Sequence, residues 1–230
     1  MAVHKARILA LRREPVKMTA DPKNAEKTET HRMSSHAPLA PVILASGSPH
    51  RKRLLQQLGI KFDVLAPDID ERRVEGESGR DYVARLSRQK AEAVGDRHPG
   101  AVIIGSDQTA VLGKDLVGKP GDHPTAVRQL LAASGRCLQF LTGLCVLDTR
   151  TTGHTIDIAT VEAQFRPLDE ATVERYLQLE PAYDCAGSFR SEGLGVSLLD
   201  AMRGDDPTAL VGLPLIRLGA RLRALGYPVP

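Results

Sequence analysis

The sequence lacks the features that mark membrane and secreted proteins. No stretch approaches the roughly 20 apolar residues that cross a bilayer. The best candidate for the apolar part of a secretory signal, ILAL at 8–11, is too short. The three cysteines, Cys137, Cys145 and Cys185, are odd in number and form no Cys-x-x-Cys pair. These absences argue against a membrane partner, a disulfide framework and a zinc site, and they predict a cytoplasmic protein.

Aromatic residues are also scarce, at 3% of the 230 residues, with no tryptophan and none of any kind in residues 1–40. That segment carries eight lysines and arginines against four acidic residues, which more than accounts for the net charge of +3. Its composition predicts a flexible, disordered N-terminal extension at 1–40 and a single domain at 41–230. The basic excess belongs to the extension, so charge gives no support for nucleic-acid binding by the domain.

Strand and helix signals alternate from Pro41 onward. Helices are predicted at about 49–58, 80–95, 122–133, 168–180 and 214–225, and strands in VILAS, FDVLA, AVIIGS, CLQFLTGLCVLD and HTIDIATVEAQFR. The stretch TAVLGKDLVG predicts a hairpin that turns near Gly113-Lys114. The last two strands are long and adjacent, which favours a mixed sheet. We therefore expect an α/β or α+β fold with a mixed central sheet flanked by helices.

Residues 46–55, SGSPHRKRLL, place basic side chains at the start of a predicted helix. A helix N-terminus carries partial positive charge and normally attracts acids, yet no acidic residue occurs between Ser46 and Gly59. A capped surface helix with solvated cations does not explain this. An anion site does, because free N–H groups, two hydroxyls and a guanidinium can converge on phosphate. Ser46 and Ser48 as nucleophiles are less well supported, since ASGSP is not the Gly-x-Ser-x-Gly elbow.

The stretch GKDLVGKP at 113–120 begins like a phosphate-binding P-loop. The match fails at its end, because Pro120 stands where the loop needs Ser or Thr for magnesium. Lys119 is then either an exposed hairpin lysine or a fixed cation. Taken alone, the exposed lysine is the better interpretation.

Acidic residues follow two of the predicted strands. The apolar strand in IIGSDQ at 103–108 is expected to end at Ser106, directly before Asp107, which is either a turn former or a functional acid delivered into a cleft. Asp70 and Glu71 in the loop PDIDE are solvated charges unless Asp107 joins them in holding a hard cation through oxygen ligands. The seven histidines have no spacing typical of a metal site.

The loop CAGSFRSEG at 185–193 carries polar side chains between two turns of small residues. Ser188, Arg190, Ser191 and Glu192 would suit recognition of the polar edge of a ligand.

Together these segments resemble the Maf family of nucleoside triphosphate pyrophosphatases, over nearly all of residues 42–225. ASGSPHRKRLLQQLGIKFDVLAPDIDE looks like the opening signature, SRQKA like the second helix of the family, and IIGSDQTAVLGKDLVGKP like its aspartate strand and Gly-Lys-Pro turn. The Ser-Asp-Gln triplet, CAGSFRSEG and DPTALVGLPLI at 206–216 are most similar to the 7-methyl-GTP branch. The N-terminal extension has no counterpart.

The resemblance implies a fold of two lobes with a deep cleft, a divalent metal cation (Mg or Mn) and usually a homodimer. It implies hydrolysis of the α–β phosphoanhydride of a nucleoside triphosphate, here 7-methyl-GTP, to the monophosphate and pyrophosphate, as house-cleaning of modified nucleotides. Carried onto this sequence, it makes Asp107 the general base and places Glu71 and Asp107 near the metal. It assigns triphosphate binding to Ser48, Arg51, Lys90 and Lys119, and base specificity to His50, Gln108 and Glu192.

Two residues depart from the pattern of the branch. An aromatic ring often stands at the position of His50, where it suits stacking on a cationic 7-methylguanine. Histidine stacks less well and repels that cation when protonated. Arg53 stands where Glu or a small residue is common. These changes bear on the preferred base and leave the reaction class untouched.

Functions of other classes are less well supported. A non-catalytic nucleotide-binding regulator of septum formation or cell division would not need a base, yet Asp107 is retained together with the cations on the phosphate side. A kinase would need an intact P-loop and a second substrate motif, and the P-loop match is broken at Pro120.

Overall fold

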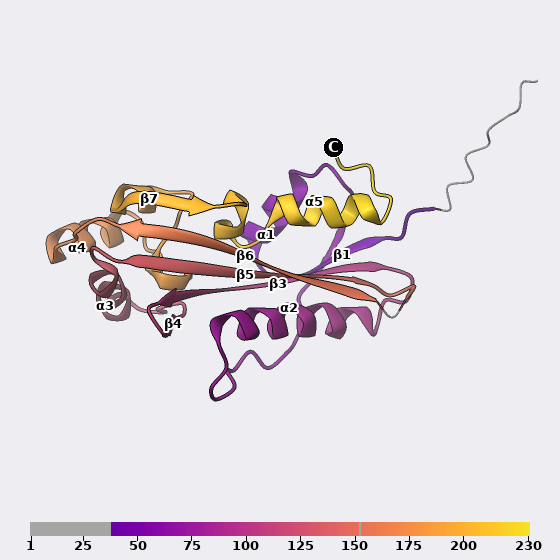
Figure 1. Ribbon diagram of the computed structural model, residues 1–230, viewed down its shortest axis with the longest axis horizontal. Helices are drawn as coiled ribbons and strands as arrows, with labels where there is room; N and C mark the ends of the chain where they lie inside the picture. Colours follow the sequence, from indigo (N-terminus) through magenta and orange to yellow (C-terminus); the bar gives the residue numbers. More distant parts are fainter. Residues whose placement is uncertain (1–37, 152) are drawn as a thin grey trace, which may run out of the picture. The chain divides into compact units, whose positions relative to one another are not determined.

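A seven-stranded mixed sheet organises the part of the chain that the computed structural model describes, residues 38–151 and 153–230 (Figure 1). The predicted extension falls almost entirely on residues 1–37, outside this range, and stays a prediction. The strands are β1 (Val42–Ala45), β2 (Asp63–Leu65), β3 (Val102–Leu112), β4 (Asp115–Val117), β5 (Cys137–Asp148), β6 (His154–Phe165) and β7 (Leu199–Gly204). Their order is β2-β1-β3-β5-β6-β7, with β4 paired to β3.

The sheet combines parallel and antiparallel pairs, which confirms the mixed sheet predicted from the sequence. Strand β1 runs parallel to both β2 and β3, whereas β3, β5, β6 and β7 are successively antiparallel. The hairpin between β3 and β4 turns at Gly113 as predicted, with a φ of 67° that glycine adopts without strain. Strand β7 was not predicted, because LDAMRG lacks the alternation of a half-buried strand.

Five α-helices flank the sheet, close to where the sequence predicts them. They are α1 (Pro49–Gln56), α2 (Gly79–Gly95), α3 (His123–Ala133), α4 (Glu170–Leu179) and α5 (Leu215–Ala224). Three short 3₁₀ helices, η1 (Ala186–Ser188), η2 (Leu194–Leu198) and η3 (Pro207–Val211), lie among the later elements. The α-helices α1 to α4 each begin behind a Ser or Asp whose side chain accepts a hydrogen bond from a backbone N–H of the first turn.

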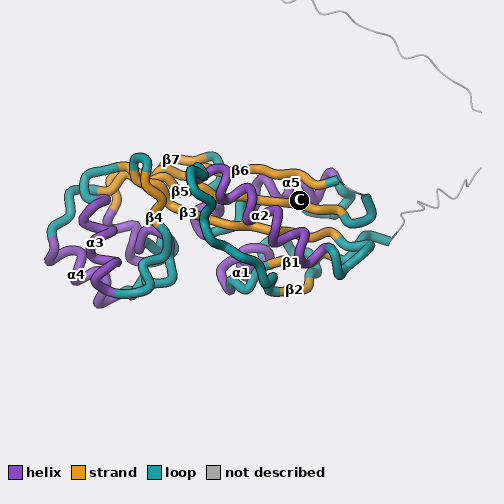
Figure 2. The backbone as a smooth tube through the Cα atoms, turned by 90° about the horizontal axis from the view of Figure 1, so that it is seen from below, coloured by secondary structure: helices purple, strands orange, loops and turns teal. Residues whose placement is uncertain are grey.

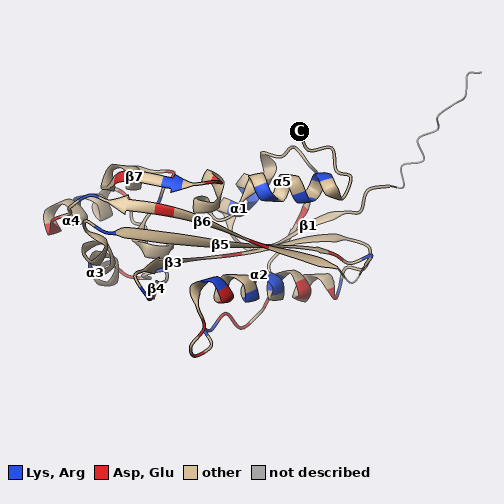
Figure 3. Cartoon of the chain, in the orientation of Figure 1, with Lys and Arg blue, Asp and Glu red and all other residues tan. Residues whose placement is uncertain are grey.

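The helices gather at two ends of the long strands. Helix α2 lies on one face of the sheet and α5 on the opposite face, while α3 and α4 lie at the far end (Figures 1 and 2). Helix α5 carries only basic charged residues, whereas α2 carries both signs (Figure 3). None of the helices in the described residues is long and apolar enough to span a bilayer.

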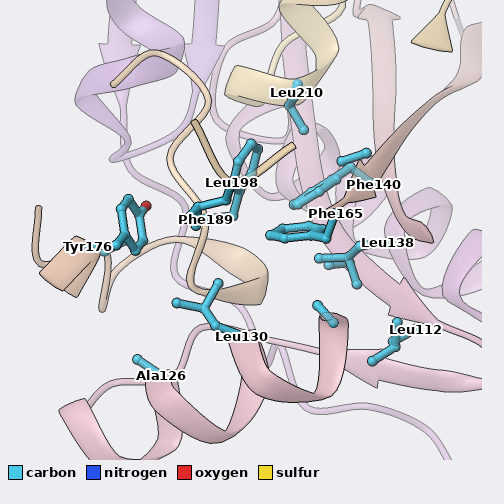
Figure 4. Close-up of a cluster of buried hydrophobic side chains, with 14 of the residues drawn as sticks. Leu112, Ala126, Leu130, Leu138, Phe140, Phe165, Tyr176, Phe189, Leu198 and Leu210 are labelled. Carbon is cyan, nitrogen blue, oxygen red and sulfur yellow. The ribbon is translucent and has the colours of Figure 1, made fainter. Parts of the chain in front are cut away.

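Three hydrophobic clusters pack against the sheet in the described residues, and the two larger ones divide the fold into lobes. One core packs α3 and α4 against β5 and β6, with Leu130, Phe140, Phe165 and Phe189 among its buried side chains (Figure 4). The other core packs α1 and α5 against β1, β3 and β5. We call these the α3–α4 lobe and the α1–α5 lobe. Strands β3 and β5 contribute to both cores and join the lobes, which confirms the two-lobed fold that was expected.

The prediction that a strand ends at Ser106 is wrong. Strand β3 continues to Leu112, and Asp107 pairs with Gly143 of β5 in the middle of the ladder. The residues TAVL, predicted as one arm of the hairpin, are the second half of the same strand. Asp107 reaches a cleft nevertheless, because the sheet runs between the two lobes at this point.

Two glycines on neighbouring strands let α2 approach the sheet closely. A Cβ at Gly105 would collide with the backbone carbonyl of Ser87, and one at Gly143 would lie 2.5 Å from the carbonyl of Val83. The Ser87 hydroxyl accepts a hydrogen bond from the backbone N–H of Asp107, at 2.9 Å. This close packing brings Lys90, one turn further along α2, to the Asp107 carboxylate.

Candidate active site

A cavity of about 600 Å³ lies between the two lobes and is walled by both. Its lining comes from α1, the loop after β2, α2, β3, the segment after β4, the loop after η1, and η3. Every residue to which the family resemblance assigned a role lines it: Ser48, His50, Arg51, Glu71, Lys90, Asp107, Gln108, Lys119 and Glu192. Side chains up to 144 positions apart in the chain therefore share one cavity.

Two carboxylates and a lysine meet on the floor of this cavity. The Lys90 ammonium lies 2.6 Å from Asp107 Oδ1 and 2.8 Å from Glu71 Oε1. Lys90 and Asp107 are buried, whereas the Glu71 side chain is 55% exposed. An ammonium has three N–H donors, so the two carboxylates leave one for a ligand. A buried carboxylate held by a single cation and open to a cavity is suited to take a proton from water.

The loop that carries Glu71 is attached to α2 by Tyr82. The Tyr82 hydroxyl donates to the backbone carbonyl of Glu71 at 3.1 Å. Burial, followed by the negative charges of Asp107 and Glu71, raises the pKa of Tyr82. The hydroxyl therefore keeps its proton and remains a donor. Tyr82 also lines the cavity, and sequence reasoning gave no signal for it.

The N-terminus of α1 points its polar groups into the same cavity. The Ser48 side chain caps the helix through the backbone N–H of Arg51, at 3.4 Å. Ser46 Oγ accepts from the Ser48 backbone N–H at 3.1 Å and from the Arg51 guanidinium at 3.4 Å. No acidic residue lies in the first turn. Because helix N–H groups, hydroxyls and a guanidinium converge here, this end of the cavity is suited to a phosphate chain.

Arg51 is held on its far side by a main-chain carbonyl. Arg51 Nε donates to Gly212 O at 2.8 Å, and the Ser106 hydroxyl donates to the same oxygen at 2.9 Å. Burial lowers the pKa of Arg51, and the charges of Asp107 and Glu71 oppose this effect. Gly212 follows η3 and has a φ of 117°, which favours glycine. In the sequence, Gly212 appeared only as part of the motif DPTALVGLPLI at 206–216, which gave no reason to expect a contact between its carbonyl and Arg51.

The remaining predicted residues occupy the rim and the opposite wall. His50 Nδ1 lies 2.9 Å from Glu192 Oε1. The Gln108 amide donates to the backbone carbonyls of Ala209 and Leu210 at 2.8 and 2.9 Å, which fixes the side chain against η3. Lys119 makes no ion pair or side-chain hydrogen bond within residues 38–151 and 153–230, so its ammonium remains available.

Several residues considered from the sequence turn away from the cavity. Asp70 binds Arg72 through both oxygens and does not join Glu71 as a ligand. Ser188 is buried and donates to Gln129 on α3 at 2.6 Å. Arg190 pairs with Asp184 at 3.0 Å. In the loop at 185–193, the charged side chain that lines the cavity is therefore Glu192, while the buried Phe189 adds an apolar wall that was not foreseen.

The cysteine and the two serines at the start of α1 that line this cavity are poorly suited to act as nucleophiles. Burial raises the pKa of the Cys185 thiol, which lines the wall, to about 11. The thiol is therefore neutral near pH 7 and unreactive. Ser46 and Ser48 have no histidine within hydrogen-bonding contact among the described residues, and both serve the N-terminus of α1. Acid–base chemistry on water is the remaining interpretation.

A divalent cation fits the carboxylate pair only if a ligand brings further oxygens. The described residues hold no group of three His, Cys, Asp or Glu side chains that could bind a metal alone. Lys90 engages one oxygen of Asp107 and one of Glu71, which leaves a second oxygen on each carboxylate. Mg²⁺ is typically bound by one or two protein carboxylates together with phosphate oxygens of the substrate. Glu71 and Asp107 could therefore hold a divalent cation only together with a ligand that brings oxygens of its own.

Comparison with known proteins shows which family this chain belongs to. The model of the family described as Maf-like protein matches residues 41–225. A 7-methyl-GTP pyrophosphatase of Nitrosococcus oceani is 50% identical over 198 residues, which covers 86% of this chain and 100% of that protein. One from Alkalilimnicola ehrlichii is 51% identical over 189 residues, 82% of this chain and 95% of its own. The resemblance seen in the sequence is confirmed, and the chain belongs to the Maf family.

Proposed function

We propose that this protein is a nucleoside triphosphate pyrophosphatase that acts on 7-methyl-GTP and removes modified nucleotides from the pool. The observation that carries the proposal is the buried Asp107 carboxylate, open to a cavity whose other end is the cationic N-terminus of α1. Pyrophosphatases of this name from two bacteria are half identical to the chain over nearly their full length.

In the proposed reaction, Asp107 takes a proton from a water molecule, and the water oxygen attacks the α-phosphorus. The α–β anhydride bond breaks, and the products are a nucleoside monophosphate and pyrophosphate. Arg51, Lys119 and the N–H groups of α1 bind the triphosphate, and the free N–H of Lys90 adds a contact near the attacking water. Glu71 and Asp107 would hold Mg²⁺ or Mn²⁺, which supplies neutralisation of phosphate charge when bound.

Base recognition is assigned to the rim of the cavity. The Glu192 carboxylate accepts hydrogen bonds from the N1–H and N2–H edge of guanine and compensates the positive charge of the methylated ring. Gln108, fixed against η3, presents the rest of its amide to the base. We further propose a cytoplasmic homodimer that binds neither nucleic acid nor membrane. Its free cysteines, Cys137, Cys145 and Cys185, fit a reducing compartment.

The test is pyrophosphate release from 7-methyl-GTP, GTP, dTTP, UTP and CTP with Mg²⁺ or Mn²⁺. The wild type is expected to prefer 7-methyl-GTP, and Asp107→Asn is expected to lose about 10²- to 10⁴-fold in kcat because the general base is gone. Asp115→Asn on β4, an exposed position outside the cavity, is the matched control. Preference for another of the five nucleotides would replace 7-methyl-GTP as the proposed substrate and leave the reaction class in place. If none of the five nucleotides released pyrophosphate, the proposal of an enzyme would be rejected in favour of a nucleotide-binding regulator.

A further inference from the structure

The segment that carries Lys119 connects β4 to α3 and forms neither helix nor strand. The Lys119 side chain is exposed, so the reach of its ammonium depends on how firmly the backbone on either side is held. The Gly118 carbonyl accepts from the backbone N–H of Gly187 at 3.2 Å, and the Gly121 N–H donates to the Tyr183 carbonyl at 3.1 Å. The segment is therefore attached to the chain around η1 on both sides of Lys119.

Gln129 on α3 makes a second connection between the same two parts of the chain. Its amide Nε2 donates to the Gly118 carbonyl at 3.2 Å, and the Ser188 hydroxyl donates to its Oε1 at 2.6 Å. A carbonyl oxygen only accepts hydrogen bonds, so the amide nitrogen must face Gly118 and the amide oxygen is left for Ser188. Helix α3 and strand β4 lie at the same end of the sheet (Figure 1). One amide thus binds the residue before Lys119 and the loop that carries Glu192.

Ser188 adopts a backbone conformation that favours glycine. In the part of the chain that the structure describes, it is the one residue other than glycine with a positive φ, 56°, and it is fully buried. Such strain persists where surrounding contacts offset it, and it is common at functional sites. A glycine would relieve the strain, but only a side chain with a hydroxyl can donate to the Gln129 oxygen. The serine therefore gives up conformational ease and gains the contact with Gln129.

We propose that Gln129, held in turn by Ser188, is a positioning residue that fixes the backbone of Lys119 for phosphate binding. Neither Gln129 nor Ser188 lines the cavity, so both act through Lys119. A lysine has a flexible four-carbon stem, and binding pays for the ordering of every mobile group that it engages. A backbone that is already anchored lowers this cost. The inference rests on the proposed function only for the role of Lys119 as a phosphate ligand.

The test measures binding of pyrophosphate in the presence of Mg²⁺ and needs no hydrolysis. Isothermal titration calorimetry would give dissociation constants for the full-length wild type, Gln129→Leu, Lys119→Met and the double variant. Leucine is close to glutamine in size and removes both hydrogen bonds of the amide. Gln129→Leu is expected to bind pyrophosphate about three- to tenfold more weakly. In the Lys119→Met background the same change is expected to alter the affinity by less than about twofold.

Gln178→Leu is the matched control, because it makes the same chemical change at an exposed position on the neighbouring helix α4, outside the cavity. It should bind pyrophosphate as the wild type does. A general loosening of the α3–α4 lobe by Gln129→Leu would weaken binding to the same extent with and without Lys119, so the double-mutant cycle separates positioning from a structural effect.

Ser188→Gly separates the two roles in another way. It removes the hydroxyl that holds Gln129 and also relieves the backbone strain at this position. Its urea midpoint is therefore expected to equal or exceed that of the wild type, whereas its affinity for pyrophosphate is expected to fall about two- to fivefold. Stability and binding should thus move apart, which a purely structural role of the serine does not predict.

Three results would overturn the inference. They are equal weakening by Gln129→Leu with and without Lys119, wild-type affinity in both Gln129→Leu and Ser188→Gly, and no binding of pyrophosphate by the wild type. The last would mean that Lys119 meets no phosphate. If nucleotides were not hydrolysed while the variants bound pyrophosphate in the expected order, the proposed function would fail and the positioning role of Gln129 would stand.

Discussion

At the scale of single residues, Arg51 shows why the basic start of α1 needs an arginine guanidinium at this position rather than any positive charge. One edge of its guanidinium donates to the Gly212 carbonyl and another reaches Ser46 Oγ. The remaining N–H groups are left for the cavity. A planar fork can serve a fixed carbonyl and a phosphate at the same time, whereas a lysine ammonium is a point charge on a flexible stem. The neighbouring Lys52 and Arg53 are exposed and have no such role.

Arg51→Lys is therefore expected to lower kcat/KM for 7-methyl-GTP by about 10- to 100-fold, or about 1.4–2.8 kcal/mol of transition-state stabilisation. Steady-state kinetics would measure the loss. Arg53→Lys, two positions along the same helix, is the matched control and should keep wild-type kinetics. Wild-type kcat/KM in Arg51→Lys would show that only the charge matters and that the Gly212 contact does not.

The sequence was a good guide to which residues belong to the cavity and a poor guide to their partners. Glu71 and Asp70 are adjacent acids in one loop, and only the local backbone direction sends Glu71 to Lys90 and Asp70 to Arg72. The same holds for Ser188, whose backbone has a φ of 56° and whose hydroxyl points to α3. Spacing within a loop carries no information about these directions, because loops have no fixed period.

At the scale of elements, α2 positions the loop that carries Glu71. Beside the Tyr82 contact, Arg85 binds both oxygens of Glu77 at 2.7 Å and donates to the backbone carbonyl of Arg72. The hydrogen bonds from Arg85 keep the pKa of Glu77 below its usual range. The folded protein therefore favours the ionised form. The resulting stabilisation is complete above the ordinary glutamate pKa of about 4.3 and disappears as the pH falls through the lower folded-state value.

Glu77→Gln is expected to lower the free energy of unfolding by about 1 kcal/mol at pH 7. Its difference from the wild type should vanish in acid, below the folded-state pKa of Glu77. Urea unfolding at a series of pH values would measure both. Glu75→Gln, an exposed glutamate of the same loop, is the control and should track the wild type. A difference between Glu77→Gln and wild type that persisted unchanged in acid would mean that the ion pair is not its source.

The boundaries of most elements could be predicted, because caps and glycines mark them. Ser48, Ser78, Asp122 and Asp169 begin helices, and Gly113 turns the hairpin. The length of β3 could not be predicted. Asp107, in the middle of β3, makes the sequence predict the end of a strand, because a charged residue inside a strand ladder is unusual without a partner of opposite charge. The partner is Lys90 of α2, and only the packing of α2 on the sheet supplies it.

At the scale of the whole described unit, the two cores share β3 and β5, so neither lobe has a complete sheet of its own. The lobes should therefore unfold together. Leu130→Ala in the α3–α4 lobe and Leu44→Ala in the α1–α5 lobe each remove a fully buried side chain. Each is expected to cost about 2–5 kcal/mol and to leave a single transition.

Urea unfolding followed by far-UV circular dichroism and by tyrosine fluorescence would test this, since Tyr176 and Tyr227 lie in different cores. Leu131→Ala, beside Leu130 but 37% exposed, is the control and should cost far less. Two transitions, or a variant that shifts one probe and not the other, would show that the lobes are independent.

The sequence by itself determined most of the elements, the family and many of the residues that line the cavity, because each depends on local patterns: hydrophobic period, capping residues, and motifs that keep their order along the chain. The tertiary structure alone decided how those residues meet. It set Lys90 between Glu71 and Asp107, placed the Gly212 carbonyl against Arg51, and joined His50 to Glu192 across the cavity. These contacts span large separations in sequence, and they follow from the packing of helices on a shared sheet, which no local pattern encodes.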